Sequence, residues 1–227
     1  MSLNILVVAA SSAEADVLRK IPGINEKSGI YSFGNHRISL LVTGVGSMAV
    51  SWAMTKWLSS NPMPDLALNA GIAGSYREDI IIGEVVIPVS DCFADAGIET
   101  GNGFITLAEA GLEDSDIFPF RGGKLIADNE FVARAVMKMK PVTAITVNTA
   151  TGSETTIEKL RNKYNPDIET MEGATFFYIC SRGKIPFLAM RSVSNRVEPR
   201  NKDKWDIPAA LDSLSEKLGE FLLMQDG

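Results

Sequence analysis

Apolar and polar positions follow two different patterns along most of the chain. Short continuous apolar runs, such as 5–9 and the centre of 65–69, predict strands that are buried on both faces. Apolar residues at helical spacing, as in 47–58 and 209–224, predict amphipathic helices. Strands are expected at 5–9, 30–33, 37–42, 65–69, 84–88, 144–147 and 187–192, and helices at 13–20, 47–58, 129–139, 155–163, 171–182 and 209–224.

This alternation of strands and helices predicts an α/β layered fold. In such folds a ligand lies at the carboxyl ends of the parallel strands. The segments that follow the expected strands are rich in small and hydroxyl-bearing residues, which favours a shared ligand pocket, although each alone is also typical of a tight turn. These segments are 10–14, 43–46, 69–74, 89–97, 148–153 and 192–195.

Composition bounds the class of protein. The 227 residues are 45% hydrophobic and 22% charged, which suits one substantial core, and we expect residues 1–227 to form a single domain. The net charge of −6 argues against nucleic acid or an anionic membrane as the main partner. No apolar run approaches the thickness of a bilayer and the N-terminus lacks a basic leader region, so a cytoplasmic protein is expected.

Few residues could hold a metal or form a disulfide. Cys92 and Cys180 lie in apolar surroundings typical of reduced, packed thiols. The single histidine, His36, follows Gly34-Asn35, a pair typical of a hairpin turn, and is expected to be solvated there. No metal site is therefore expected.

A glycine motif at 43–49, Thr-Gly-Val-Gly-Ser-Met-Ala, matches the dinucleotide-binding pattern. That pattern needs an acidic residue at the end of the next strand, whereas Asp65 precedes its strand. A hairpin also takes the place of the expected first βαβ unit, so a nicotinamide enzyme is disfavoured. The glycines still allow the backbone to approach a ligand oxygen at a helix start, and a plain tight turn explains them equally well.

One carboxylate and one amide suggest a nucleoside site. Glu172 stands in Met171-Glu-Gly-Ala at the expected start of a helix, and Asn195 ends Arg191-Ser-Val-Ser-Asn after an apolar run. A carboxylate accepts hydrogen bonds from sugar hydroxyls, whereas an amide both donates to and accepts from a base. The alternative for Glu172 is a carboxylate that merely favours the positive end of the helix dipole.

Taken together, several segments resemble the purine nucleoside phosphorylase/nucleosidase superfamily. They are 5–14, 43–46, 69–74, 171–174 and 191–195, in this order over nearly the whole chain. The resemblance implies a three-layer α/β/α sandwich around a mixed, partly barrel-like sheet, and a nucleoside substrate without a cofactor. It also implies a homodimer or larger homo-oligomer, in which a loop such as 89–97 crosses to the neighbouring subunit.

The resemblance also implies roles for single residues. Glu14 matches the acid that activates water, while Glu172 binds the ribose and Met171 packs against it. Segment 4–17 contains no lysine or arginine to hold an attacking phosphate, which favours water as the nucleophile. The base and pocket contacts are assigned to Gly71, Ile72, Arg191 and Ser194, with Ser194 orienting Asn195 and Arg191 either contacting the ligand or holding the loop.

Asn195 distinguishes between purine bases. An amide NH₂ donates to O6 or N7 of a 6-oxopurine, whereas a protonated aspartate suits the N6 and N7 of a 6-aminopurine. The methylthioadenosine nucleosidases carry that aspartate, so the motifs are most similar to the branch of the superfamily that releases hypoxanthine from futalosine in menaquinone synthesis. Methylthioadenosine cleavage, inosine phosphorolysis and a non-catalytic nucleoside-binding protein stay open as alternatives.

Two parts of the ligand are poorly constrained by the sequence. Phe93 and Phe104 are the candidates for an aromatic ring on the base, although core packing explains either. A basic run after Asn195 could meet a carboxylate on the far side of the ribose, or simply be solvated. Its members are Arg196, Arg200, Lys202 and Lys204.

Overall fold

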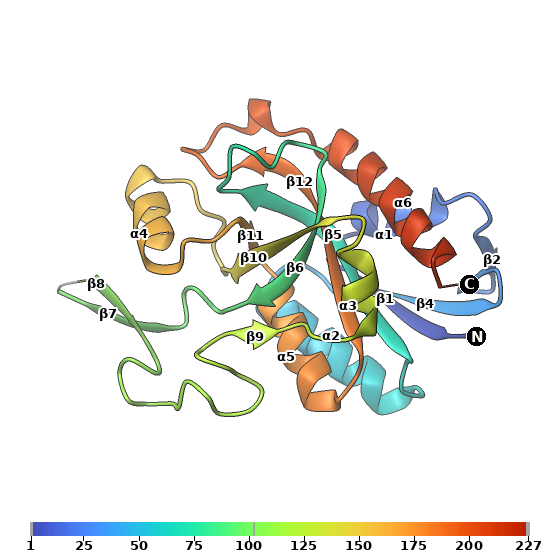
Figure 1. The fold of residues 1–227 in the computed structure, drawn as a ribbon, viewed down its shortest axis with the longest axis horizontal. Helices are drawn as coiled ribbons and strands as arrows, with labels where there is room; N and C mark the ends of the chain where they lie inside the picture. The colour runs from blue at the N-terminus through green and yellow to red at the C-terminus, as the bar shows by residue number, and fades with distance from the viewer. Residues whose placement is uncertain (1, 102, 226–227) are drawn as a thin grey trace.

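The computed structural model describes residues 2–101 and 103–225. Its strands are β1 (Asn4–Ala9), β2 (Asn25–Lys27), β3 (Ile30–Phe33), β4 (His36–Val42), β5 (Leu66–Ser75), β6 (Val85–Asp91), β7 (Gly97–Thr100), β8 (Gly103–Thr106), β9 (Leu125–Ile126), β10 (Lys140–Thr146), β11 (Ile168–Thr170) and β12 (Phe187–Arg196) (Figure 1). Its helices are α1 (Ser12–Arg19), α2 (Ser47–Ser60), α3 (Glu130–Ala135), α4 (Glu154–Tyr164), α5 (Gly173–Gly183) and α6 (Ile207–Leu223), with a 3₁₀ turn, η1 (Lys202–Lys204).

The main sheet closes on itself along part of its length. Its strand order is β11-β10-β6-β12-β5-β1-β4-β3-β2, and β11 also pairs antiparallel with β5. Five strands, β5, β12, β6, β10 and β11, therefore form a small barrel, and β1 to β4 extend from it as an open sheet. The expected mixed, partly barrel-like sheet is confirmed.

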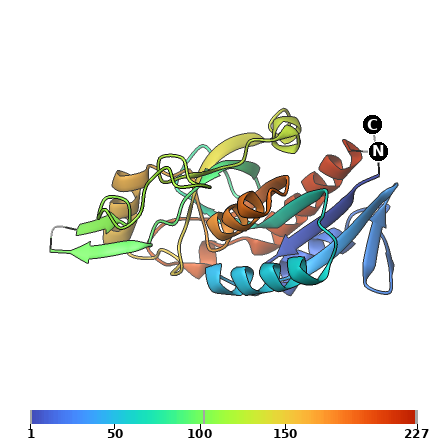
Figure 2. The same cartoon turned by 90° about the horizontal axis from the view of Figure 1, so that it is seen from below.

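Helices cover the sheet in pairs. The helix α6 packs on α1, and α5 packs on α2, as Figures 1 and 2 both show for the second pair. The chain moves one way across the sheet from β1 to β4 and the opposite way from β4 to β5. Because crossovers between parallel strands are right-handed, α1 and α2 lie on opposite faces. This arrangement gives the expected three-layer sandwich.

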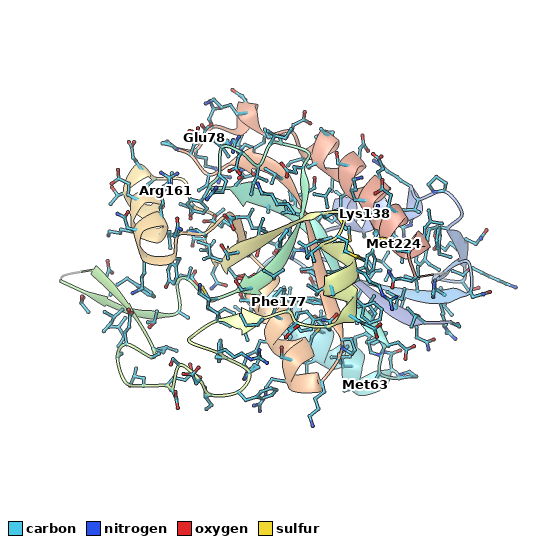
Figure 3. The ribbon with its side chains drawn as sticks, viewed as in Figure 1. Met63, Glu78, Lys138, Arg161, Phe177 and Met224 are labelled. Carbon is cyan, nitrogen blue, oxygen red and sulfur yellow. The ribbon has the colours of Figure 1, made fainter. Side chains whose placement is uncertain are left out.

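An aromatic cluster fixes α5 against β12. Phe176 and Phe177 are fully buried, and both rings meet Phe187 edge to face, with centroids 5.8 and 4.8 Å away. Figure 3 labels Phe177 among the side chains. Such pairs add to the stabilisation that burial of the rings gives. The cluster holds the helix that begins next to Glu172, so core packing and the position of a site residue are linked.

Strands β5 and β12 run further than their sequences predict. The segments 69–74 and 192–195 were expected to be loops, but they continue the two strands, which pair from Phe187↔Ala67 to Arg196↔Ser75. Each strand gives the other backbone hydrogen-bond partners, and this tertiary pairing overrides the weak strand preference of glycine and asparagine.

Strand β6 also runs further than the expected strand 84–88, which was predicted to end at Pro88. The strand continues through Pro88 to Asp91, and its pairing with β10 shifts register between Val142 and Thr143. Proline lacks the N–H that a regular ladder needs, and an irregular register tolerates it. The short strands β2, β7, β8, β9 and β11 were not predicted, because none carries a long apolar pattern.

The expectation for His36 was wrong. Its side chain is 1% exposed, and its Nδ1 accepts a hydrogen bond from the backbone N–H of Leu3 at 3.1 Å. Because β4 pairs with β1, His36 at the start of β4 lies against the N-terminal residue Leu3 and is buried there.

Cys92 and Cys180 are buried, unpaired thiols, as expected. Within the described chain, no helix combines the length and apolar character needed to cross a membrane.

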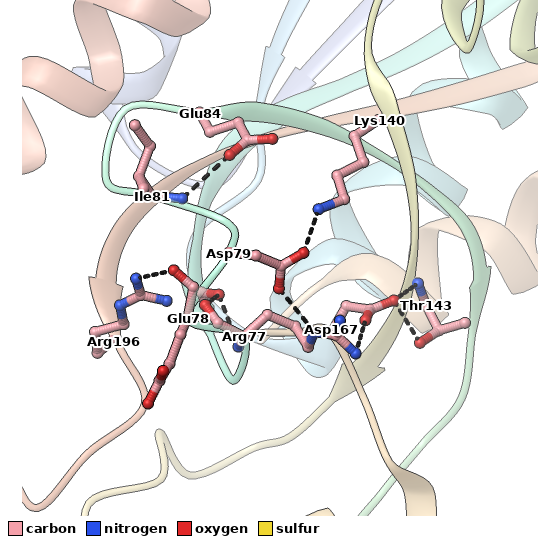
Figure 4. A network of polar contacts seen from close by, with 10 residues as sticks. Arg77, Glu78, Asp79, Ile81, Glu84, Lys140, Thr143, Asp167 and Arg196 are labelled. Carbon is pink, nitrogen blue, oxygen red and sulfur yellow. Dashed lines mark hydrogen bonds and ion pairs between the residues drawn. The ribbon is translucent and has the colours of Figure 1, made fainter.

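A polar network secures the connection between β5 and β6 (Figure 4). Asp79 accepts from Arg77 Nε at 3.0 Å and from Lys140 Nζ at 2.7 Å, which ties the connection to the start of β10. Arg196, the residue after Asn195, donates to the carbonyl of Glu78 at 2.6 Å. The ion pairs are exposed and stabilise the fold only weakly, but they fix the chain beside the end of β12.

Candidate active site

A cavity of about 210 Å³ opens where the carboxyl ends of β1, β5 and β12 meet. Its lining includes six of the residues singled out from the sequence, drawn from segments far apart in the chain: Glu14, Ile72, Met171, Glu172, Ser194 and Asn195. The other lining residues are Ala10, Ser11, Val45, Ala73, Gly74, Ala150, Thr151, Glu169, Thr170, Val197 and Trp205. Gly71 and Arg191 lie behind this wall.

Glu14 is held by backbone donors from the turn after β1 and from β5. Its Oε2 accepts from the N–H groups of Ala10 and Ser11 at 3.1 and 3.0 Å, and its Oε1 accepts from the N–H of Ile72 at 3.0 Å. Ser11 caps α1 and forms a reciprocal capping box with Glu14. The carboxylate is therefore fixed at the cavity wall, and Ile72 contributes to it through its backbone.

Gly71 gives Glu14 the space that it needs. A Cβ on Gly71 would lie 2.7 Å from Glu14 Oε1 and 3.7 Å from Arg191 Cζ. Since real Cβ atoms do not approach that closely, any larger residue would displace the carboxylate. The predicted site role of Gly71 thus has a steric basis, and the residue itself does not line the cavity.

Glu172 stands at the N-cap position of α5, where the glycine motif of segment 43–46 meets it. Its Oε1 accepts from the N–H of Gly46 at 2.8 Å, and Gly46 has a φ of 92°, which favours glycine. Burial raises the pKa of Glu172, while the Gly46 N–H and the charge of Arg191 oppose that rise. The glycine motif therefore holds a carboxylate in this structure.

Asn195, another lining residue, has an amide of fixed orientation. Its Nδ2 donates to the carbonyl of Arg196 at 2.9 Å, and its Oδ1 accepts from Ser194 Oγ at 2.8 Å. An amide nitrogen carries two hydrogens, so one N–H is left for a ligand. The expected contact between Ser194 and Asn195 is present.

Arg191 is a buried countercharge behind the cavity. It is 2% exposed and donates through Nη1 to the carbonyls of Asn69 and Met190 at 2.8 and 3.1 Å, and through Nη2 to Asn69 Oδ1. Burial lowers its pKa, and attraction to Glu172, Glu14 and Asp91 opposes that change. Of the two roles that the sequence left open, these contacts match the structural one.

Asp91 is an acid that the sequence analysis missed. It is 1% exposed, and its Oδ1 accepts from Thr146 Oγ1 at 3.0 Å and from the N–H of Cys92 at 2.8 Å. Thr146 Oγ1 in turn accepts from the N–H of Ala174 at 2.7 Å, in the first turn of α5. A Cβ on Gly173 would lie 2.1 Å from Asp91 Oδ2, which explains the glycine after Glu172.

The environment of Asp91 favours its neutral form. Burial raises its pKa to about 7, and the charge of Glu172 adds to the rise, while Thr146, Arg191 and the N–H of Cys92 oppose it. The sequence did contain a signal for Asp91, because it is an acidic residue within the apolar segment 85–93. Burying such a group without partners is costly, so its presence there indicates a special role.

Glu169 and Trp205 are further lining residues that were not predicted. Glu169 is 7% exposed and accepts from the N–H of Thr151 at 2.8 Å and from Tyr76 Oη at 3.0 Å. Trp205 is the aromatic residue of the cavity wall, whereas the predicted candidates Phe93 and Phe104 lie outside that wall. Among the residues described, no three His, Cys, Asp or Glu side chains form a group that could hold a metal ion.

Comparison with known proteins agrees with this geometry. Residues 4–223 match the model of the phosphorylase superfamily. The chain is similar to the futalosine hydrolases of Streptomyces coelicolor (29% identity, 96% of this chain and 95% of that protein) and Acidothermus cellulolyticus (31%, 94% and 88%). It is also similar to a 5'-methylthioadenosine/S-adenosylhomocysteine nucleosidase of Buchnera aphidicola (26%, 91% and 86%).

Solved structures share the fold. The methylthioadenosine/S-adenosylhomocysteine nucleosidase of Neisseria meningitidis, in complex with methylthio-immucillin-A, superimposes with a TM-score of 0.79 at 17% identity, covering 96% of this chain and 98% of that one. The native futalosine hydrolase of Helicobacter pylori gives a TM-score of 0.74 at 16% identity, covering 98% and 97%.

The raised pKa of Asp91 gives a pH-dependent stability that can be measured. An unfolded aspartate titrates near ~3.9, so between about pH 4 and pH 7 the folded protein keeps a proton that the unfolded chain has lost. This contribution to the free energy of unfolding therefore falls as pH rises through that window, by at most about 1.4 kcal/mol per pH unit. Asp91→Asn removes the contribution.

Urea denaturation of the native protein and Asp91→Asn at several pH values tests this expectation. The variant should gain stability relative to the native protein from about pH 4 to pH 7, with little further change above. Asp212→Asn, on an exposed position of α6, is the control and should follow the native curve. Parallel curves for native protein and Asp91→Asn would show that Asp91 is ionised throughout.

Proposed function

Because this chain belongs to the phosphorylase superfamily, we propose that it hydrolyses the N-glycosidic bond of a purine nucleoside, futalosine, and releases hypoxanthine. One observation carries the proposal: a single cavity brings together an acid held by backbone donors, a second acid at a helix start, and an amide. The futalosine hydrolases to which the chain is similar match it over nearly its whole length.

Cleavage of the bond leaves a ribosyl group with cationic character at C1′, while the bonding electrons pass into the base. Glu172 binds the ribose hydroxyls, and its negative charge stabilises that cation. Met171 packs against the sugar. Glu14 accepts the proton of the water whose oxygen bonds to C1′. The fixed position of Glu14 between Ser11 and Ile72 supports this role, since a general base must be held within reach of its water.

The nucleophile is water in this proposal. Among the described residues that line the cavity, none is a lysine or an arginine. Phosphorolysis needs cationic donors around the attacking phosphate. The buried guanidinium of Arg191 already donates to Asn69 and Met190, and Arg191 is not one of the lining residues.

The base is assigned through Asn195. Its remaining N–H can donate to O6 or N7 of hypoxanthine, and Ser194 holds the amide in that orientation. A neutral amide cannot transfer a full proton, so the proton that Glu14 accepts from the attacking water is returned to solvent, and solvent protonates the departing base. Trp205 provides an aromatic surface in the same cavity.

A methylthioadenosine nucleosidase is the second candidate. The similarity to the Buchnera aphidicola nucleosidase supports it. An adenine base would place its N6 hydrogens against the free N–H of Asn195, and this mismatch makes it the less favoured candidate.

We also propose a homo-oligomer, as the sequence analysis expected. Val45 lines the cavity and is 60% exposed, and Met48 and Trp52 on α2 are 86% and 71% exposed. Such a group of large apolar side chains is typical of a protein interface. A second copy seated on α2 would cover the open side of the cavity.

Direct assay tests the activity. The protein is incubated with futalosine, inosine and methylthioadenosine, each with and without phosphate, and the free base is quantified. Hypoxanthine release from futalosine without phosphate is expected. Phosphate-dependent cleavage of inosine would exclude the hydrolase proposal, and rapid adenine release would exclude the assignment of Asn195. Absence of turnover with every substrate would favour a nucleoside-binding protein.

Glu14→Gln tests the nucleophile step. Loss of the general base should lower kcat by about 100-fold or more, while the affinity for hypoxanthine changes little. Circular dichroism checks that the amide, which meets the N–H groups of Ala10 and Ile72, leaves α1 folded. A rate close to that of the native enzyme would show that Glu14 does not activate water.

Light scattering after size exclusion tests the assembly. The native protein should elute as a dimer or larger species, and Trp52→Glu should shift it toward the monomer and reduce turnover, because the cavity loses its cover. Leu223→Glu, at an exposed apolar position on α6 away from α2, is the control for the added charge. A monomeric native protein with full activity would contradict the proposal.

A further inference from the structure

Two threonine hydroxyls cap the start of α5. Glu172 occupies the N-cap position of this helix, but its side chain makes no capping hydrogen bond. Instead, the N–H of Gly173 donates to Thr170 Oγ1 at 3.2 Å. The N–H of Ala174 donates to Thr146 Oγ1 at 2.7 Å. The first N–H groups of a helix have no partner within the helix, so these hydroxyls do the work of an N-cap side chain.

The main sheet places both hydroxyls beside the helix. Thr146 is the last residue of β10, Thr170 is the last residue of β11, and the two are register partners in this parallel pair. Side chains at one level of neighbouring strands project from the same face. Both residues are buried, and their hydroxyl oxygens lie 3.3 Å apart. Pairing of β10 with β11 therefore assembles the cap from two strands.

Asp91, at the end of β6, orients the hydroxyl of Thr146. Thr146 Oγ1 donates to Asp91 Oδ1 at 3.0 Å. A hydroxyl has one hydrogen and two accepting positions, so Thr146 can accept from both the Ala174 N–H and the Thr170 hydroxyl. Gly173 allows the helix to begin this close to the strands, because a Cβ there would lie 2.1 Å from Asp91 Oδ2 and 2.9 Å from Thr170 Oγ1.

The carboxylate of Glu172 is directed away from its own helix. Its Oε1 accepts from the N–H of Gly46 at 2.8 Å, and the residue lines the candidate active site. The free N–H groups and the dipole of a helix attract a carboxylate at the N-cap position. The threonine hydroxyls already occupy two of those N–H groups, which removes that competition. Arg191, Glu14 and Asp91 act electrostatically on Glu172 from other elements.

We propose that Thr146 and Thr170 are positioning residues that cap α5 in place of Glu172 and so leave its carboxylate free to bind the ribose of the substrate. This inference rests on the proposed function, in which Glu172 binds the sugar hydroxyls, and it adds the residues that keep this acid available. Without the two hydroxyls, the carboxylate turns back to α5. A substrate must then displace it from the helix, which lowers the apparent affinity.

Thr146→Val is the first informative variant, because valine keeps the branched shape and removes the hydroxyl. The Ala174 N–H then becomes available to the Glu172 carboxylate. Thr146→Ser restores a hydroxyl and should restore the native behaviour. Thr175→Val is the matched control, since it makes the same exchange in the first turn of α5 at a buried hydroxyl that has no hydrogen-bond partner among the described residues.

Thr170→Val is the second informative variant. It releases the N–H of Gly173 and does not remove a hydrogen bond to Asp91. Thr146→Val does remove one, and a change in the charge of Asp91 would also act on Glu172. Both variants are therefore needed. Circular dichroism checks folding, and Thr170→Val alone decides the outcome if Thr146→Val does not fold.

NMR titration of the Glu172 carboxyl, without substrate, measures the capping role. Its signal is assigned by its loss in Glu172→Gln. Burial raises the pKa of Glu172 in the native protein. Hydrogen bonds from the helix stabilise the charged form, so this pKa should fall in Thr146→Val and in Thr170→Val and stay native in Thr146→Ser and Thr175→Val. An unchanged pKa in Thr170→Val would overturn the inference, because a fall in Thr146→Val alone would trace to Asp91.

Steady-state kinetics measure the consequence for the substrate. In Thr146→Val and Thr170→Val the KM for futalosine should rise by roughly two- to thirtyfold, the value of one helix cap, at a kcat close to native. The affinity for free hypoxanthine, which lacks the ribose, should not change. A lower kcat at unchanged KM would indicate general damage to the site and would contradict the positioning role.

The NMR titration also separates this inference from the proposed function, since it requires no turnover. An active native protein whose Glu172 pKa is the same in both informative variants rejects the role of the threonines alone. A native protein that cleaves none of the nucleosides rejects the proposed function, and the titration still decides whether the two hydroxyls keep Glu172 away from α5.

Discussion

Strands β5 and β12 lie in parallel register from Ala67 and Phe187 to Ser75 and Arg196, and the candidate active site depends on this pairing. It places Asn195 beside Gly74 and carries the guanidinium of Arg191 to the backbone of Asn69. Ladder hydrogen bonds on both sides of a register shift between Val193 and Asn195 allow glycine-rich and polar segments to remain extended. Without the pairing, these residues would belong to two mobile loops with no common geometry.

Buried charge is the second constraint on the site. Glu14, Glu172 and Asp91 all act electrostatically on Arg191, which is itself almost wholly buried. A buried cation offsets the repulsion among nearby carboxylates, and backbone N–H groups of Ile72 and Gly46 stabilise two of them directly. Asp91 Oδ2 has no hydrogen-bond partner among the described residues, and burial raises the pKa of this carboxyl to about 7.

Much of the site could be expected from the sequence, because its acids stand at recognisable helix starts. Ser11 and Glu14 have the spacing of a capping box, and Glu172 precedes a buried helix, so local sequence constrains both. Glu169 could not be anticipated in this way. It lies on a three-residue strand whose polarity pattern is too short to interpret, and its partner Tyr76 is 93 residues away.

The sequence by itself determined the alternation of helices and strands, the family, and the chemical types of the residues at the candidate site. These features depend on local periodicity and on short motifs that each segment carries within itself. Only the tertiary structure decided that β5 and β12 extend to Ser75 and Arg196, that His36 is buried, and that Glu169 and Asn195 both pair with Gly74. Such features follow from hydrogen bonding and burial between segments that are distant in the sequence. The local sequence of one segment does not specify which distant segments it will contact.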